Sequence, residues 1–211
     1  MKGRFMNGLV KVTGYPAQKL VFRLQVHYED KNIQSRRIKG PAIIISNHTS
    51  VYDYAAFIYV FYSRTLRYQM AEVLFKKKLQ GWFLRQMGGI QVNRNVNDFG
   101  FVTRSKEILE SGGVVGIFPE SRLPKEGEER PLPFKSSAAL IALESGVPVI
   151  PVYTKGGYFA KGKVPIMIGT PMLAADYVSE DASARENLLK ITEAMRNKVI
   201  ELGNRLDEET L

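Results

Sequence analysis

Residues 41–53 read Pro-Ala-Ile-Ile-Ile-Ser-Asn-His-Thr-Ser-Val-Tyr-Asp. The run of isoleucines predicts a short strand that is buried on both faces, as in a parallel sheet covered by helices. The polar residues that follow can end this strand and cap a helix that we expect to begin near Tyr52. Functional sites in such sheets lie beyond the carboxyl ends of the strands, so His48 and Asp53 stand where chemistry is expected.

Short apolar runs alternate with helical patterns along the rest of the chain. Further strands are expected at residues 67–70, 90–92, 114–118, 147–153 and 164–168. Helices are expected at residues 52–62, 74–87, 98–111, 136–145 and 182–205. This alternation predicts an α/β fold with a mostly parallel central sheet flanked by helices.

The N-terminal residues form a segment of their own character. Residues 5–26 have apolar positions at helical spacing with Lys and Arg between them, and Gly14 and Pro16 are expected to break the segment into two helices. We therefore divide the chain into an amphipathic basic helical segment, residues 1–30, and a main domain, residues 31–211. The segment either docks on the core or lies at a membrane interface.

Charge is distributed unevenly along the chain. Residues 1–90 hold fifteen Lys and Arg against four Asp and Glu, whereas residues 171–211 hold five against nine, and the net charge is +9. The basic half suits an anionic partner, either membrane lipid or nucleic acid. The absence of cysteine excludes disulfides and thiolate chemistry, and two histidines in total argue against a histidine-rich metal site.

No apolar run approaches the length of a membrane span. The longest, Tyr54–Tyr62, has nine residues, whereas a span needs about 18. The basic start of the chain is not followed by an apolar stretch with a cleavage site, so no signal peptide is expected. These features predict a cytoplasmic protein that lies peripherally on the inner face of the cell membrane.

His48 and Asp53 are the residues best placed for acid–base chemistry. A carboxylate five residues on can fix the tautomer of the imidazole and stabilise the imidazolium that forms when His48 takes a proton. His48 and Asp53 would correspond to the base and the orienting residue of a Ser-His-Asp triad, without its protein nucleophile. The nucleophile would then be a hydroxyl of the substrate. By spacing alone, a structural histidine beside a capping aspartate is the commoner case, and the position at a strand end favours the catalytic interpretation.

Two other expected strands also end in polar residues. Arg94 follows residues 90–92, and Glu120, Ser121 and Arg122 follow residues 114–118. Arginine suits bidentate binding of phosphate. The alternative for Glu120 and an arginine is a simple ion pair on the rim of the sheet.

Four blocks in order resemble the lysophosphatidic acid acyltransferase family, the 1-acyl-glycerol-3-phosphate acyltransferases among the glycerolipid acyltransferases. Residues 47–53 match its N-H-x-x-x-x-D block, and residues 89–94 match a second block that ends in arginine. Residues 117–122 resemble its F-P-E-G-T-R block, and residues 147–152 match the fourth. The resemblance extends from about residue 20 to about residue 170, so residues 31–211 would be an acyltransferase domain with the layered fold of that family.

The resemblance implies roles for the site residues. His48 would deprotonate a lysophospholipid hydroxyl, which attacks an acyl thioester, and Asp53 would orient His48. Arg94, Glu120, Ser121 and Arg122 would bind the acceptor, 1-acyl-glycerol-3-phosphate, and residues near Pro148 would shape the acyl-donor site. The donor would be acyl-CoA or an acyl carrier protein thioester, with no bound cofactor and no metal.

One departure separates the chain from the family pattern. The family has Gly-Thr between the glutamate and the arginine of its third block, whereas this chain has Ser121 alone, so Ser121 would supply the hydroxyl. The shorter turn leaves open a different lysolipid or an amino-lipid acceptor. Two alternatives from other classes are a hydrolase that uses the same dyad on water and a basic nucleic-acid-binding module, which would give the dyad no role. We expect no nucleic-acid partner.

A membrane partner is expected because the substrates are lipids. Apolar residues at 74, 75, 79, 82 and 83 surround Lys76, Lys77 and Lys78, a composition that suits an anionic membrane surface. The alternative is that the aromatic residues belong to the core and that the lysines are merely solvated.

Overall fold

The computed structural model describes residues 4–93 and 99–210. Their strands form one sheet in the order β1-β7-β6-β2-β5-β3-β4. The strands span β1 Leu24–Tyr28, β2 Ala42–Ser46, β3 Leu66–Ala71, β4 Ile90–Val92, β5 Val114–Ile117, β6 Val149–Thr154 and β7 Val164–Ile168. The five strands from β2 to β6 run parallel, β7 is antiparallel to β6, and β1 is parallel to β7. The expected α/β fold with a mostly parallel sheet is confirmed.

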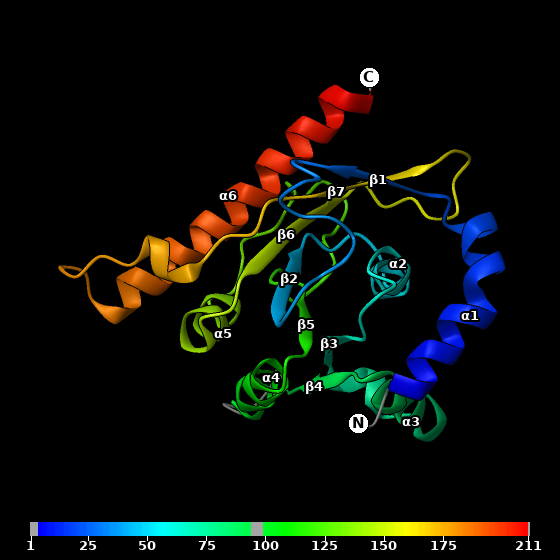
Figure 1. The fold of residues 1–211 in the computed structure, drawn as a ribbon, viewed down its shortest axis with the longest axis horizontal. Coiled ribbons are helices and arrows are strands. Elements are labelled where there is room, and N and C mark those ends of the chain that lie inside the picture. The colour runs from blue at the N-terminus through cyan, green and yellow to red at the C-terminus, as the bar shows by residue number, and fades with distance from the viewer. Residues whose placement is uncertain (1–3, 94–98, 211) are drawn as a thin grey trace.

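Helices cover both faces of the sheet (Figure 1). They span α1 Arg4–Val21, α2 Asp53–Val60, α3 Lys78–Met87, α4 Gly100–Glu110, α5 Ser137–Ser145 and α6 Ala184–Thr210, with 3-10 turns η1 Glu72–Phe75 and η2 Ala174–Tyr177. On the central strand β2, Ile43 and Ile45 pack with α4, α5 and α6, whereas Ile44 packs with α2 on the other face. Successive side chains of a strand point to opposite faces, so a run of isoleucines suits a strand that is buried on both.

The N-terminal region differs from the expectation in two ways. First, α1 is one helix through Gly14 and Pro16. Proline removes one hydrogen bond of a helix, but Pro16 lies on the exposed side of α1. Gly14 lets Tyr59 of α2 approach closely, because a Cβ at position 14 would stand 2.1 Å from the Tyr59 hydroxyl. Packing against α2 therefore keeps the helix continuous.

Second, the expected helix over residues 5–26 gives way to β1 at Leu24–Tyr28. This strand lies at the edge of the sheet and pairs with β7, and all its residues are half-buried. A half-buried strand needs no continuous apolar run, and the sequence of β1 lacks the run that marks the inner strands. The sheet thus includes residues that the sequence assigned to the N-terminal segment 1–30.

The parallel strands bring their carboxyl ends to one edge of the sheet. His48 follows β2, Glu120 follows β5 and Tyr158 follows β6, and β2 pairs directly with both β5 and β6. Residues from distant parts of the chain therefore meet next to the start of α2.

Candidate active site

His48 and Asp53 form a hydrogen-bonded pair at the end of β2. The His48 Nδ1 atom lies 2.8 Å from Asp53 Oδ2. The Asp53 side chain is fully buried, whereas the side chain of His48 is 20% exposed. The Nε2 atom of His48 makes no hydrogen bond to any other described residue. With Nδ1 held by the carboxylate, Nε2 is the nitrogen that can take a proton from a substrate.

Local backbone geometry explains why Asp53 faces His48. The backbone N–H groups of Thr49 and Ser50 donate to Asp53 Oδ2 at 2.7 and 2.9 Å, and the Thr49 hydroxyl donates to Oδ1 at 2.9 Å. The Asp53 N–H donates back to the Ser50 carbonyl at 3.1 Å. Asp53 therefore accepts the backbone N–H groups of the turn before α2. These hydrogen bonds compensate for the burial of its carboxylate.

The Asn47 side chain fixes the start of this turn. Its amide nitrogen donates to the Thr154 carbonyl at 2.8 Å, and its amide oxygen accepts from the Thr154 N–H at 2.9 Å. Asn47 thus continues the pairing of β2 with β6 through its side chain. The sequence motif contains Asn47, but only the sheet order shows which strand it contacts.

The imidazole of His48 lies flat on an aromatic ring. The Phe118 ring is stacked on it at 4.3 Å between centroids, with 12° between the planes. Phe118 in turn stacks on Tyr68 at 5.0 Å. These contacts limit the rotation of His48 and keep one of its faces away from water.

Glu120 supports His48 through its backbone. Glu120 Oε1 accepts the His48 N–H at 2.7 Å, and Oε2 accepts the Leu132 N–H at 3.0 Å. Burial raises the pKa of Glu120, and the two backbone hydrogen bonds act in the opposite direction. Both carboxylate oxygens thus hold backbone groups of the protein itself. Each can accept a further hydrogen bond, and a direct role of Glu120 in acceptor binding stays a prediction.

Arg122 lies on the surface and is held by another residue. Its guanidinium donates two hydrogen bonds of 2.7 Å to the Glu128 carboxylate. Its hydrogen bonds, with one from the Lys125 N–H, lower the pKa of Glu128 to about 2. Among the described residues, Arg122 makes no hydrogen bond to His48 or Asp53.

Ser121 occupies a conformation that favours glycine. Its φ of 63° lies in the left-handed region, and its hydroxyl donates weakly to the Pro119 carbonyl at 3.4 Å. Glycine adopts this region at no steric cost. A hydroxyl role for Ser121 in acceptor binding stays a prediction. Arg94, the remaining residue expected to bind substrate, lies outside the described residues.

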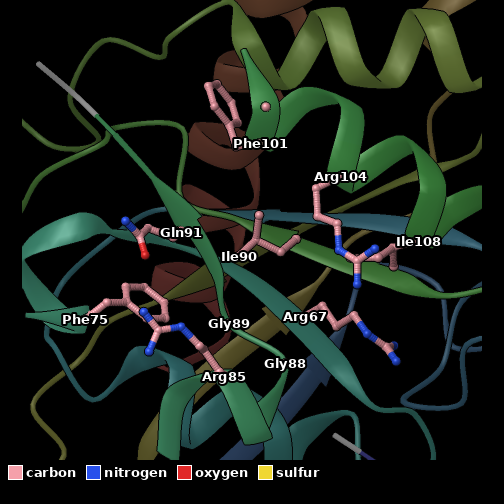
Figure 2. A pocket seen from close by; sticks show the side chains of 11 residues that line it. Arg67, Phe75, Arg85, Gly88, Gly89, Ile90, Gln91, Phe101, Arg104 and Ile108 are labelled. Atoms are coloured by element: carbon pink, nitrogen blue, oxygen red, sulfur yellow. The ribbon is translucent and has the colours of Figure 1, made fainter. Parts of the chain in front are cut away.

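A cavity of about 370 Å³ lies beside the edge strand β4 and away from the dyad. Arg67, Arg85 and Arg104 line it together with Gly88 and Gly89, as Figure 2 shows. Its lining contains neither His48 nor Asp53. In the part of the chain that the structure covers, no group of three or more Asp, Glu or His residues is placed to hold a metal ion.

The profile of the Acyltransferase family matches residues 23–155. This match covers well over half of the 211 residues and includes His48, Asp53 and Glu120. The chain belongs to the Acyltransferase family. Among the alternatives, this finding favours an acyl-transferring enzyme over a nucleic-acid-binding module.

Individual acyltransferases resemble the chain over most of its length. It is 30% identical over 148 residues to the 1-acyl-sn-glycerol-3-phosphate acyltransferase of Bacillus subtilis (strain 168), covering 68% of this chain and 71% of that protein. It is 29% identical over 158 residues to a chloroplastic 1-acyl-sn-glycerol-3-phosphate acyltransferase of Brassica napus, covering 67% of this chain and 44% of that protein.

The fold is also similar to a crystal structure of an acyltransferase. The 1-acyl-sn-glycerophosphate acyltransferase PlsC from Thermotoga maritima superposes with a TM-score of 0.64 at 26% identity, covering 93% of this chain and 79% of that one. The chain is accordingly an acyltransferase with the layered fold that the sequence blocks imply.

Proposed function

We propose that this acyltransferase moves a fatty acyl group from an acyl thioester to the free hydroxyl of a lysophospholipid, with 1-acyl-glycerol-3-phosphate as the acceptor and phosphatidic acid as the product. The observation that carries this proposal is the His48–Asp53 pair, whose Nδ1–Oδ2 distance is 2.8 Å and whose Nε2 atom faces no protein partner among the described residues. The acceptor is the substrate named for relatives in Bacillus subtilis and Brassica napus.

The pair supplies a general base without a nucleophile of its own. His48 Nε2 takes the proton of the acceptor hydroxyl while the hydroxyl oxygen attacks the carbonyl carbon of the thioester. The Asp53 carboxylate stabilises the imidazolium that forms. The tetrahedral intermediate then expels the thiolate, which takes the proton back from His48, so that the products are an ester and a free thiol.

We propose that Arg122 binds the phosphate of the acceptor, and the resemblance to the family proposes the same role for Arg94. A guanidinium binds phosphate through paired hydrogen bonds, as Arg122 now binds Glu128. An acceptor phosphate would have to compete with Glu128 for Arg122. Glu128→Gln should therefore lower the KM for a phosphate-bearing lysolipid and leave the KM for a lysolipid without a free phosphate monoester unchanged. Equal effects on both acceptors would contradict this placement.

The substrate class is tested by a panel of lysolipid acceptors offered with acyl-CoA and with acyl carrier protein thioester. We expect transfer to 1-acyl-glycerol-3-phosphate to exceed transfer to lysolipids with other head groups. A preference for an amino-lipid or for another lysolipid would overturn the choice of acceptor while leaving the acyltransferase chemistry intact.

The surface of α1 suits a lipid partner, because the helix turns its apolar side outward. Phe5, Val12 and Leu20 are 82%, 76% and 74% exposed. On the inner side, Asn7 is buried and Lys11 donates to the Tyr62 carbonyl at 3.1 Å. A helix that buries polar residues against the protein and exposes apolar ones is typical of a membrane-facing surface.

Helix α3 extends this surface. It packs against α1, and its residues Leu79 and Trp82 are 79% and 50% exposed, next to exposed lysines at positions 76–78. Phe75, in contrast, belongs to the core at 6% exposure, which corrects its expected place on the surface. No helix of the described residues has the length and hydrophobicity that a membrane span requires.

Vesicle binding tests whether this surface docks on an anionic membrane. Lys77→Glu with Lys78→Glu should weaken sedimentation with phosphatidylglycerol vesicles, because anionic lipid attracts nearby lysines by about 1 kcal/mol each. Lys106→Glu with Lys190→Glu, on α4 and α6, changes the net charge equally and should have little effect. Equal losses in the two pairs would show that only net charge matters and would contradict a docking face.

A further inference from the structure

Tyr158 reaches the dyad from a distant part of the chain. Its hydroxyl donates to Asp53 Oδ1 at 2.6 Å across 105 residues of sequence. The Tyr158 side chain is 2% exposed, and its ring packs against Phe22 at 5.2 Å between centroids. No pattern near Tyr158 in the sequence indicates this contact.

Two glycines bring Tyr158 into place. Gly156 and Gly157 have φ angles of 72° and 75°, which other residues adopt only with strain. A Cβ on Gly156 would stand 2.5 Å from the Thr49 hydroxyl oxygen. The loop after β6 therefore lies directly against the turn that carries His48.

The donors to Asp53 are divided between its two oxygens. Oδ2 accepts from His48, Thr49 and Ser50, whereas Oδ1 accepts from the Thr49 and Tyr158 hydroxyls. Among the described residues, Tyr158 is the one donor to Asp53 from outside residues 48–50. Burial and the negative charge of Asp53 raise the pKa of Tyr158, so its hydroxyl keeps its proton and remains a donor.

We propose that Tyr158 is a positioning residue for the dyad, which fixes the Asp53 carboxylate and moderates the negative charge that this carboxylate presents to His48. This inference rests on the proposed role of His48 as the general base. A carboxylate that loses one donor has its charge shared among fewer hydrogen bonds and attracts the imidazolium more strongly. Without the hydroxyl, His48 should therefore hold its proton up to a higher pH.

Two other groups contact His48. Glu120 accepts the backbone N–H of His48, and the Phe118 ring stacks on its imidazole. Neither contacts Tyr158 through a hydrogen bond. The Tyr158 hydroxyl also interacts with the side chains of Thr49 and Thr154. A change in the titration of His48 in Tyr158→Phe would thus be transmitted through Asp53 and its donor Thr49.

The test follows both histidines of the chain by NMR as the pH is changed. In Tyr158→Phe, the midpoint of the His48 titration should rise by about half a pH unit or more, while that of His27 stays in place. The acid limb of the kcat/KM profile should move in the same direction, and kcat should fall by about tenfold. The matched control is Tyr59→Phe, which removes a hydroxyl that donates to the Val10 carbonyl at 3.0 Å.

A second variant covers the case in which Tyr158→Phe does not fold. Placing 3-fluorotyrosine at position 158 keeps the ring and the hydrogen bond but makes the hydroxyl a stronger donor, so the His48 midpoint should fall. If the folded variants titrate like the wild type, Tyr158 has only a structural role and the inference is wrong. The NMR midpoint does not depend on turnover, so this result is distinguishable from a failure of the proposed function, which His48→Ala tests separately.

Discussion

Replacing Asp53 by asparagine would separate the charge of this side chain from its shape. In the protein, Asp53 Oδ2 accepts from His48 Nδ1 at 2.8 Å and from the N–H groups of Thr49 and Ser50 at 2.7 and 2.9 Å. The amide oxygen of asparagine can take over these three bonds. Its NH₂ group would then face the hydroxyls of Thr49 and Tyr158, which can rotate and accept. We therefore expect Asp53→Asn to fold.

The activity of Asp53→Asn should nevertheless fall steeply. Two unit charges about 4 Å apart in an effective dielectric constant of about 20 attract each other by about 4 kcal/mol. Asparagine cannot stabilise the imidazolium in this way, and a loss of about 4 kcal/mol corresponds to about a thousandfold in rate. Asp53→Ala, in contrast, would leave the donors to Asp53 unsatisfied at a cost of about 1–3 kcal/mol each, comparable to the whole stability of a domain.

The assay measures thioester consumption with a lysolipid acceptor, together with the melting temperature of each variant. We expect Asp53→Asn to melt near the wild type with a rate about a thousandfold lower, and Asp53→Ala to lose its cooperative melt. An asparagine variant that retains both the melting temperature and more than about a tenth of the rate would refute the electrostatic role of Asp53.

Three smaller predictions concern the surroundings of the dyad and of α1. Gly156→Ala should lower both stability and rate, because its Cβ would stand 2.5 Å from the Thr49 hydroxyl. Gly157→Ala shares the positive φ but meets open space, so it should lower both by less; equal losses in the two variants would contradict this. Ser121→Gly should raise the melting temperature by about 2–4 °C, because the left-handed conformation costs a non-glycine residue about 1 kcal/mol. An unchanged melting temperature in calorimetry would argue against backbone strain at Ser121. Burial lowers the pKa of Lys11 from 10.5 to about 8. Between pH 8 and pH 10.5 the unfolded chain therefore binds more protons than the folded protein. The free energy of unfolding should rise with pH across this range. Urea melts of Lys11→Met should lack that rise, and a rise equal to that of the wild type would contradict the assignment.

The sequence predicted the central features of the fold and of the dyad because both depend on local patterns. The isoleucines of β2 require burial on both faces, which only an inner strand of a covered sheet provides. Asp53 lies one short turn after His48, so their contact follows from spacing once the strand end is fixed. The edge strand β1 was missed because its apolar and polar residues alternate over only five half-buried positions, and these were counted with the helical pattern of residues 5–26.

Contacts made between distant strand ends could not be predicted in the same way. The sequence placed Glu120 at a strand end, but only the pairing of β2 with β5 shows that its carboxylate holds the His48 backbone. Tyr158 reaches Asp53 because β6 pairs with β2 and two glycines turn the chain. The sequence analysis assigned Arg122 to phosphate binding, yet its side chain is bound to Glu128, six residues on. The spacing of these two charges does not show whether they pair with each other or stay free for a substrate.

The central claim is that His48 is the general base for the transfer of an acyl group from a thioester to a lipid hydroxyl. The most direct measurement compares wild type with His48→Ala, using a labelled acyl thioester with and without 1-acyl-glycerol-3-phosphate and following both thioester loss and labelled phosphatidic acid. We expect the wild type to consume thioester only when the acceptor is present, in equal amount to the lipid formed, and His48→Ala to do neither. Full transfer by His48→Ala, or thioester loss at the full rate without acceptor, would contradict it.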